Sequence, residues 1–284
     1  MAKRSDLHKL ALLVLAPLSV AACQRQEAGS DPAPQPAPTP PPATTTLPTA
    51  LSRTDLVAAL ATAASTHAAG GTPDGAALAG RSFALKLPFG CTGPAGATGP
   101  DGLAAWRWSD DGRSQTLSLV PADWTAGGPA GSAGDPPWDR VDGYWISRPW
   151  LATGGCPPVA APVPPSDGPD GQPPAALPAS PLTDGLAVIH PEGGSRLGRR
   201  ADNAYRHVLR GPEGRAPAAP ARGYRLVLEG RVTTFPDGRP VRCSAPGPDA
   251  RPTCIAAVSL DIVAFETADG VRLGEWRADQ GRSL

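Results

Sequence analysis

Apolar and polar residues recur in two different rhythms along the chain after residue 50. From residue 54 to 69, Leu56, Leu60 and Ala64 recur every fourth residue, which is the spacing of an amphipathic helix. Ser52 or Thr54 can cap its first turn, because a hydroxyl oxygen accepts a hydrogen bond from a free backbone N–H group. The pattern therefore predicts one short helix, which ends at the glycines at 70 and 71.

From Arg81 onward the rhythm changes to the two-residue alternation of β-strands. Phe83, Leu85 and Leu87 alternate with small or charged residues, so one face of this run is apolar. Segments rich in Asp, Pro and Gly at 110–113, 236–238 and 268–270 are typical of turns between strands. Further strand-like runs cover 105–108, 116–120, 141–147, 185–190, 205–209, 224–235, 240–243, 254–267 and 271–276.

The C-terminal part shows the clearest sheet pattern. Cys254–Thr267 is the longest strand-like run, and both alternate faces of residues 255–265 carry apolar side chains. A strand that is buried on both faces lies inside a sheet, so we place this one centrally. We predict a mainly β domain, an antiparallel sandwich or a partly open barrel, with one short N-terminal helix.

The first 23 residues form a pattern of their own. Three basic residues precede the apolar run Leu10–Val20, which is shorter than the roughly 20 residues that span a bilayer. Small residues Ala21 and Ala22 then lead to Cys23. The segment Val20–Cys23 resembles the lipobox of bacterial lipoproteins, which reads aliphatic, small, small, cysteine.

This resemblance implies that residues 1–22 are a signal peptide and that Cys23 is acylated when the signal is removed. Two or more acyl chains attach a protein stably to a membrane. In the sorting rule of enteric bacteria, aspartate after the cysteine retains a lipoprotein in the inner membrane. Gln24 stands there instead, which implies an outer-membrane lipoprotein facing the periplasm. The alternative is an ordinary secretory signal cleaved near Ala22.

Two segments rich in proline, alanine and glycine divide the rest of the chain. Residues 23–50 contain the lipidated cysteine and too few apolar side chains to form a core. They predict an extended, disordered tether that holds the domain off the lipid surface. Residues 157–181 predict a long Pro/Gly-rich loop within the β-rich domain, which we place at 51–284.

The charge balance argues against nucleic acid as a partner. The chain has 26 basic and 26 acidic side chains, and removal of residues 1–22 leaves two more acids than bases. A local excess of arginine in residues 192–225 can meet an anionic envelope component, or it is a solvated loop. Its members are Arg196, Arg199, Arg200, Arg206, Arg210, Arg215, Arg222 and Arg225.

Four cysteines remain after Cys23, and an even number in an exported chain indicates disulfide bonds. Cys243 and Cys254 flank a Pro/Gly segment between two strands of an expected hairpin, where the spacing suits a bridge. We therefore predict the pairs Cys243–Cys254 and Cys91–Cys156. Free thiols and a metal site are the alternatives.

The sequence contains no set of residues that commits the protein to a reaction. His190 and His207 have no metal-type partner at the usual spacing, and Ser195 lacks the glycine that a nucleophile elbow requires. No glycine loop for a phosphate or dinucleotide is present, so we expect no cofactor and no metal. We expect a non-enzymatic outer-membrane lipoprotein that binds or scaffolds an envelope component. A hydrolase would require a cleft that gathers His190 or His207 with a carboxylate.

Six of the seven tryptophans lie between residues 106 and 150. Trp106, Trp108 and Trp145 lie in strand-like runs, and we expect all three to pack in the same core. Trp124, Trp138 and Trp150 lie beside proline, glycine or polar residues, so we expect these to be the most exposed. The alternative function is therefore a carbohydrate- or peptidoglycan-binding module that uses this tryptophan-rich surface.

Overall fold

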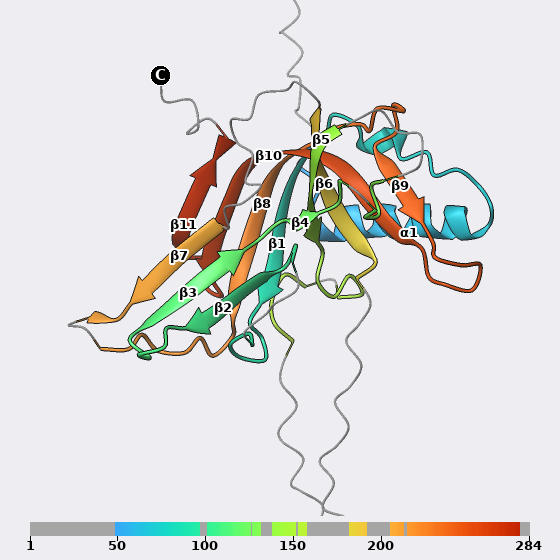
Figure 1. The fold of residues 1–284 in the computed structure, drawn as a ribbon. Helices are drawn as coiled ribbons and strands as arrows, with labels where there is room; N and C mark the ends of the chain where they lie inside the picture. Colours follow the sequence, from blue (N-terminus) through green and yellow to red (C-terminus); the bar gives the residue numbers. More distant parts are fainter. Residues whose placement is uncertain are drawn as a thin grey trace, which may run out of the picture. The chain divides into compact units, whose positions relative to one another are not determined.

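A computed structural model describes residues 49–96, 101–125, 127–131, 138–151, 153–157, 182–191, 205–212 and 215–278. The chain divides into two units, Met1–Thr46 and Leu47–Leu284, and every described residue belongs to the second (Figure 1). Cys23, the signal peptide and residues 158–181 of the expected loop lie outside the described residues. None of the described helices is long and apolar enough to cross a membrane.

The described chain is mainly β, with one α-helix, as the sequence predicts (Figure 1). The helix is α1 (Arg53–Ala68), and a single 3₁₀ turn covers Ala76–Leu78. The strands are β1 (Ser82–Phe89), β2 (Ala104–Trp108), β3 (Ser114–Leu119), β4 (Ala122–Asp123), β5 (Trp138–Trp145), β6 (Asp184–Pro191), β7 (Tyr205–Arg210), β8 (Tyr224–Val232), β9 (Val241–Ser244), β10 (Thr253–Thr267) and β11 (Arg272–Arg277).

The large sheet is built around β10, as the sequence predicts. Its strand order is β1-β8-β10-β6-β5-β4, and β9 and β11 also pair with β10. Residues Cys254–Val258 are buried one after another, and so are Val263–Glu266, because both faces of the strand are covered there. The first half of β10 pairs with β9 and β6, and the second half pairs with β8 and β11.

A smaller sheet, β2-β3-β7, packs against the large one. Leu117 and Leu119 of β3 are fully buried in the same core as Leu85 of β1 and Leu228 of β8. The ring centroids of Trp106 on β2 and Tyr224 on β8 lie 6.2 Å apart across this core. The two sheets do not close into a barrel, so the described domain is consistent with a sandwich.

Helix α1 covers β9, the start of β10 and β1. Ser52 caps it, as one of the two alternatives predicts, and the Asp55 side chain in turn accepts from the Ser52 backbone N–H at 2.8 Å. Leu56 and Leu60 are completely buried against the main core. The helix ends at Ala68, just before the glycines at 70 and 71.

A second apolar cluster lies on the opposite face of the first half of β10. Ile255 and Ala257 of β10 join Trp124, Val141 and Phe235 there. The alternate residues of the same strand, Cys254, Ala256 and Val258, belong to the main core. The alternation of side chains along one strand therefore supplies both cores.

Both predicted disulfides are present. Cys243 of β9 and Cys254 of β10 are register partners with Cα atoms 4.1 Å apart. The Cys91–Cys156 bridge joins residues 65 apart, with Cα atoms 5.3 Å apart. The turn expected at 236–238 forms, but the strands on either side of it, β8 and β9, do not pair with each other as a hairpin would. They follow each other along one edge of β10, because the turn redirects the chain along that edge instead of folding it back.

Candidate functional site

The expectation that Trp124 is exposed is wrong. Its indole is only 4% exposed and lies over the second apolar cluster. Two glycines make room for the ring: a Cβ atom built on Gly143 of β5 would lie 2.1 Å from Trp124 Cε2, and one on Gly185 of β6 would lie 2.8 Å from Cη2. The polar residues next to Trp124 in the sequence suggest an exposed loop. The ring is buried instead, because Gly143 and Gly185 have no side chains and leave space for it on two adjacent strands.

Trp145 belongs to the same cluster and not to the main core, which corrects a second expectation. Its ring lies 4.7 Å from that of Trp124, in an edge-to-face arrangement. Its neighbours Tyr144 and Ile146 face the main core, because successive residues of a strand point to opposite faces. Trp106 is buried and Trp108 is half-buried in the main core, as predicted.

The other two candidate tryptophans, Trp138 and Trp150, lie in different parts of the structure. Trp150 is 55% exposed, in a turn next to Leu151, whose carbonyl accepts from Arg53 at the start of α1. Trp138 is half-buried against Phe235 and lies beneath the guanidinium of Arg242. Arg242 lies near His67 at the C-terminal end of α1. Arg53 lies at the N-terminal end, and a helix of 16 residues separates the two ends by about 24 Å. Trp124, Trp138 and Trp150 therefore do not form one aromatic platform.

Arg242, which lies over Trp138, also lines a hollow that the sequence pattern does not indicate. This hollow has a volume of about 550 Å³ and lies between the end of α1, β9 and the segment 127–131. We call it the β9 hollow. Polar side chains from three parts of the chain line it: His67, Asp237, Arg239, Arg242 and Ser244. Cys243 also lines it, so the Cys243–Cys254 bridge fixes one wall.

Arg242 is a rigid part of this wall. Its guanidinium carbon lies 4.6 Å from the ring centroid of Phe235 and 5.4 Å from that of Trp138. Its Nη1 donates to the Ala130 carbonyl at 3.2 Å, and its Nη2 lies 3.2 Å from the Asp237 carboxylate. The side chain is only 11% exposed. Arg242 therefore holds the hollow together.

Asp237 is the acidic centre of the β9 hollow. Its Oδ1 accepts from the Arg239 backbone N–H at 3.1 Å, which closes the turn expected at 236–238. Its Oδ2 lies 3.3 Å from Arg239 Nε and 3.2 Å from Arg242 Nη2. The sequence indicates the turn correctly, but it does not show that the same aspartate orients two arginines. The one local signal is the recurrence of charge at positions 237, 239 and 242.

His190 does meet a carboxylate, which is the arrangement that a hydrolase would require. Its Nε2 lies 3.0 Å from Oδ2 of Asp142, which is buried on β5. Arg140 Nε donates to the other oxygen of Asp142 at 2.5 Å, and its Nη1 contacts Asp123 at 3.3 Å. Both carboxylate oxygens are thus in use, and no serine or threonine hydroxyl contacts His190 among the described residues. The cluster cross-links β4, β5 and β6.

His207 has a different environment. It lies on β7, and a Cβ atom built on Gly274 of β11 would lie 2.8 Å from its Nδ1, so the ring packs over that glycine. Burial lowers the pKa of His207 below its ordinary value, because burial penalises the charged form of the ring. Within the described chain, no three His, Cys, Asp or Glu side chains lie together in a way that could hold a metal ion.

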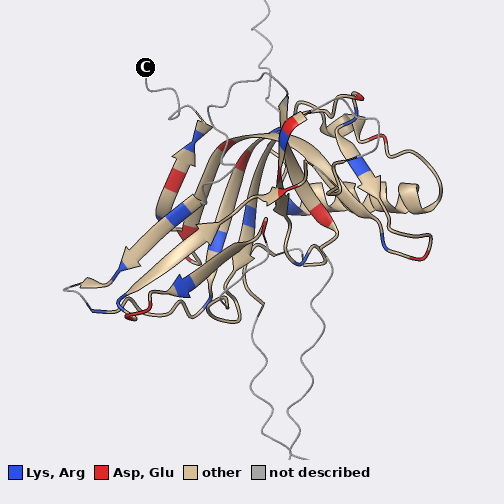
Figure 2. Ribbon diagram, in the orientation of Figure 1, with Lys and Arg blue, Asp and Glu red and all other residues tan. Residues whose placement is uncertain are grey.

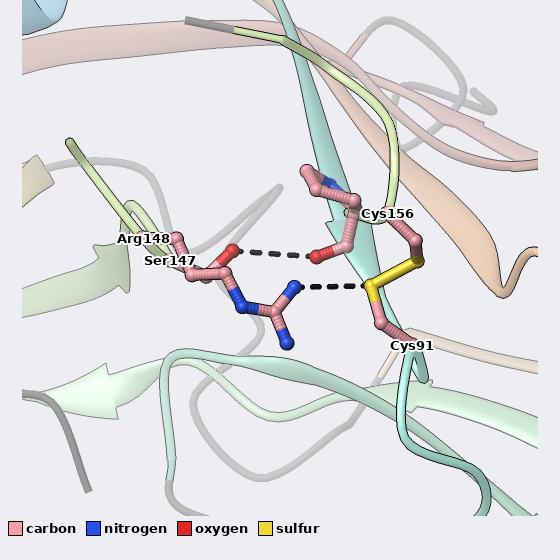
Figure 3. Close-up of a disulfide and its surroundings, with 5 residues drawn as sticks. Cys91, Ser147, Arg148 and Cys156 are labelled. Carbon is pink, nitrogen blue, oxygen red and sulfur yellow. Dashed lines mark hydrogen bonds between the residues drawn. A yellow bond between two sulfur atoms is a disulfide. The ribbon is translucent and has the colours of Figure 1, made fainter. Parts of the chain in front are cut away.

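The Cys91–Cys156 bridge anchors the loop that carries Trp150 (Figure 3). Arg148 Nη1 points at Cys91 Sγ at 3.0 Å, and the Ser147 hydroxyl donates to the Pro88 carbonyl at 3.3 Å. Buried Arg53 donates to the carbonyls of Ser147 at 2.8 Å and Arg148 at 2.7 Å. The disulfide and the contacts of Arg53, Ser147 and Arg148 therefore fix the backbone of the loop that carries the exposed indole of Trp150.

The arginines of residues 192–225 do not gather in one patch among those described. Arg206 and Arg210 lie on β7 of the small sheet, and Arg225 lies on β8 of the large sheet. Acidic and basic residues are interspersed on β8, β10 and β11, where Arg272 lies 3.3 Å from Glu266 and 3.7 Å from Glu229 (Figure 2). Arg196, Arg199 and Arg200 lie outside the described residues.

Comparison with known proteins identifies no relative. No family model, no curated protein and no solved structure matches the chain.

Proposed function

We propose that the protein is a lipid-anchored, non-enzymatic component of the bacterial cell envelope that binds another envelope component. The lipobox at Cys23 supports the anchor, and Gln24 supports the outer membrane. The two disulfides support an exported domain, because such bonds persist in oxidising compartments.

The β9 hollow is the observation that carries the binding role. It gathers basic, acidic and hydroxyl side chains from three segments, on a wall fixed by a disulfide. Its volume of about 550 Å³ lies in the range of small-ligand sites. Asp237 in its lining is paired with Arg239 and Arg242, an arrangement that favours recognition of a polar ligand.

Membrane fractionation of the Cys23→Ser variant tests the anchor. We expect the unchanged chain to sediment with outer membranes and to partition into detergent, and the variant to remain in the aqueous phase. A Cys23→Ser chain that still partitions into detergent would reject lipid anchoring.

Glycan binding remains a second candidate because of Trp150 alone. Its exposed indole stands on a loop fixed by Arg53 and by the Cys91–Cys156 bridge, and a fixed aromatic ring loses little entropy when it stacks on a sugar. The measurement is a pull-down with peptidoglycan fragments. Retention of the unchanged chain and loss of Trp150→Ala supports this role, whereas equal behaviour of both chains excludes it.

A further inference from the structure

The β9 hollow contains a guanidinium group whose outer edge is free for a ligand. Arg239 lines the hollow, and its side chain is 49% exposed. Asp237 contacts its Nε at 3.3 Å and accepts from its backbone N–H at 3.1 Å. The two terminal Nη groups of Arg239 have no partner within the part of the chain that the structure describes. Asp237 thus orients this arginine and leaves its forked end open.

The basic groups that line the hollow can bind an anion. Asp237 Oδ2 contacts both Arg239 and Arg242, which places the two guanidinium groups beside each other. His67 adds a further nitrogen donor or acceptor on the wall formed by α1. Arg242 is occupied by Ala130, Phe235 and Trp138, so Arg239 is the arginine available for binding.

We propose that the β9 hollow binds a small polar ligand through an oxyanion, either a phosphoryl group or a carboxylate, held by the two Nη groups of Arg239. Guanidinium forks bind both groups with two parallel hydrogen bonds. The volume of about 550 Å³ leaves room for a molecule larger than the oxyanion itself. This inference rests on the proposed function, since it names the ligand class of that same site.

The test is a titration of the ¹⁵N-labelled exported chain carrying Cys23→Ser, followed by nuclear magnetic resonance. Inorganic phosphate and succinate are the two probes, and sodium chloride at equal ionic strength is the reference. We expect saturable shifts at the Arg239 Nε–H group and at the amides of Cys243 and Ser244. Saturation by phosphate, by succinate or by both supports the proposal and identifies the preferred oxyanion. Shifts that match those in sodium chloride overturn it.

Arg239→Gln supplies the decisive variant, because it removes the charge and the forked guanidinium and keeps a polar side chain. We expect at least about tenfold weaker binding, since a charge-assisted hydrogen bond contributes about that factor or more. Arg231→Gln is the matched control: Arg231 is also exposed and next to the same core strand, but it does not line the hollow. Equal weakening in both variants, or none in Arg239→Gln, overturns the proposal.

The outcome is independent of lipid anchoring. The titration uses a chain without the acylated cysteine, whereas membrane fractionation reads the anchor alone. Failure of the titration with intact anchoring rejects the ligand class, and failure of anchoring with intact titration rejects the envelope location.

Discussion

Arg53 connects the start of α1 to the loop that carries Trp150. It opens α1, is 5% exposed, and donates from both terminal nitrogens to carbonyls of the segment 147–153. Burial lowers its pKa, with Arg148 acting in the same direction and Asp184 opposing it. The sequence pattern places this arginine at the edge of the expected helix but gives no sign of its role, because its partners are backbone groups about 95 residues further along.

We expect Arg53→Ala to lower the free energy of unfolding by about 3 kcal/mol, because four partly buried carbonyls would lose their donor. Urea unfolding followed by circular dichroism measures this change. Arg53→Lys should recover little, since an ammonium group cannot span the same carbonyls. Arg113→Ala, in an exposed turn, is the control, and a loss at Arg53 no larger than at Arg113 would contradict this role.

Asp184 gives the protein a pH dependence that can be isolated. Burial raises its pKa, and Arg251 and Arg53 offset only part of that effect. The folded state therefore holds this proton more tightly than the unfolded state, and its contribution to stability falls as pH rises through the folded pKa. We expect the stability difference between Asp184→Asn and the unchanged chain to grow in favour of the variant from pH 4 upward. A difference that is independent of pH would contradict this account.

The elements show which parts of the fold can be predicted from sequence. Alternation and turn residues correctly indicate β1, the β2–β3 and β10–β11 hairpins and the central place of β10. The two residues of β4 are too short for a pattern, and the parallel pairing of β6 with β10 joins segments about 70 residues apart. Such pairings depend on tertiary packing, which local periodicity does not encode.

The space that Gly143 and Gly185 leave for the Trp124 ring between β5 and β6 can be tested directly. We expect Gly143→Ala to lower the free energy of unfolding by about 2 kcal/mol, because the new methyl group would collide with the indole between β5 and β6. Chemical unfolding followed by tryptophan fluorescence measures this loss. Gly247→Ala is the matched control, since a Cβ atom there meets nothing within 4 Å. Equal effects at the two glycines would show that the indole can move aside at no cost.

For the whole molecule, the two disulfides should stabilise unequally. In the chain-entropy model, the bridge with a sequence separation of 65 contributes about 4 kcal/mol, and the one with a separation of 11 contributes about 3 kcal/mol. We therefore expect the Cys91→Ser/Cys156→Ser pair to lower the midpoint of urea unfolding more than Cys243→Ser/Cys254→Ser. The reverse order would indicate that the β9–β10 hairpin depends on its bridge for packing as well as for entropy.

The candidate site was less predictable from sequence than the fold. Cysteine spacing predicts the Cys243–Cys254 bridge, because the two residues flank a hairpin, and the Cys91–Cys156 bridge follows as the remaining pair. The β9 hollow instead combines His67, Asp237, Arg239 and Arg242 from a helix end, a turn and a strand. Their proximity results from α1 packing beside β9, which the sequence does not specify. The tryptophans mislead for the same reason, since glycines on adjacent strands decide the burial of Trp124.

Mass spectrometry of the mature protein tests the account most directly. We expect the mature chain to begin at Cys23, with a mass raised by covalently attached acyl chains and with both disulfides intact. A mature chain that begins near residue 23 without any lipid, or one that retains residues 1–22, would contradict a lipid-anchored envelope protein.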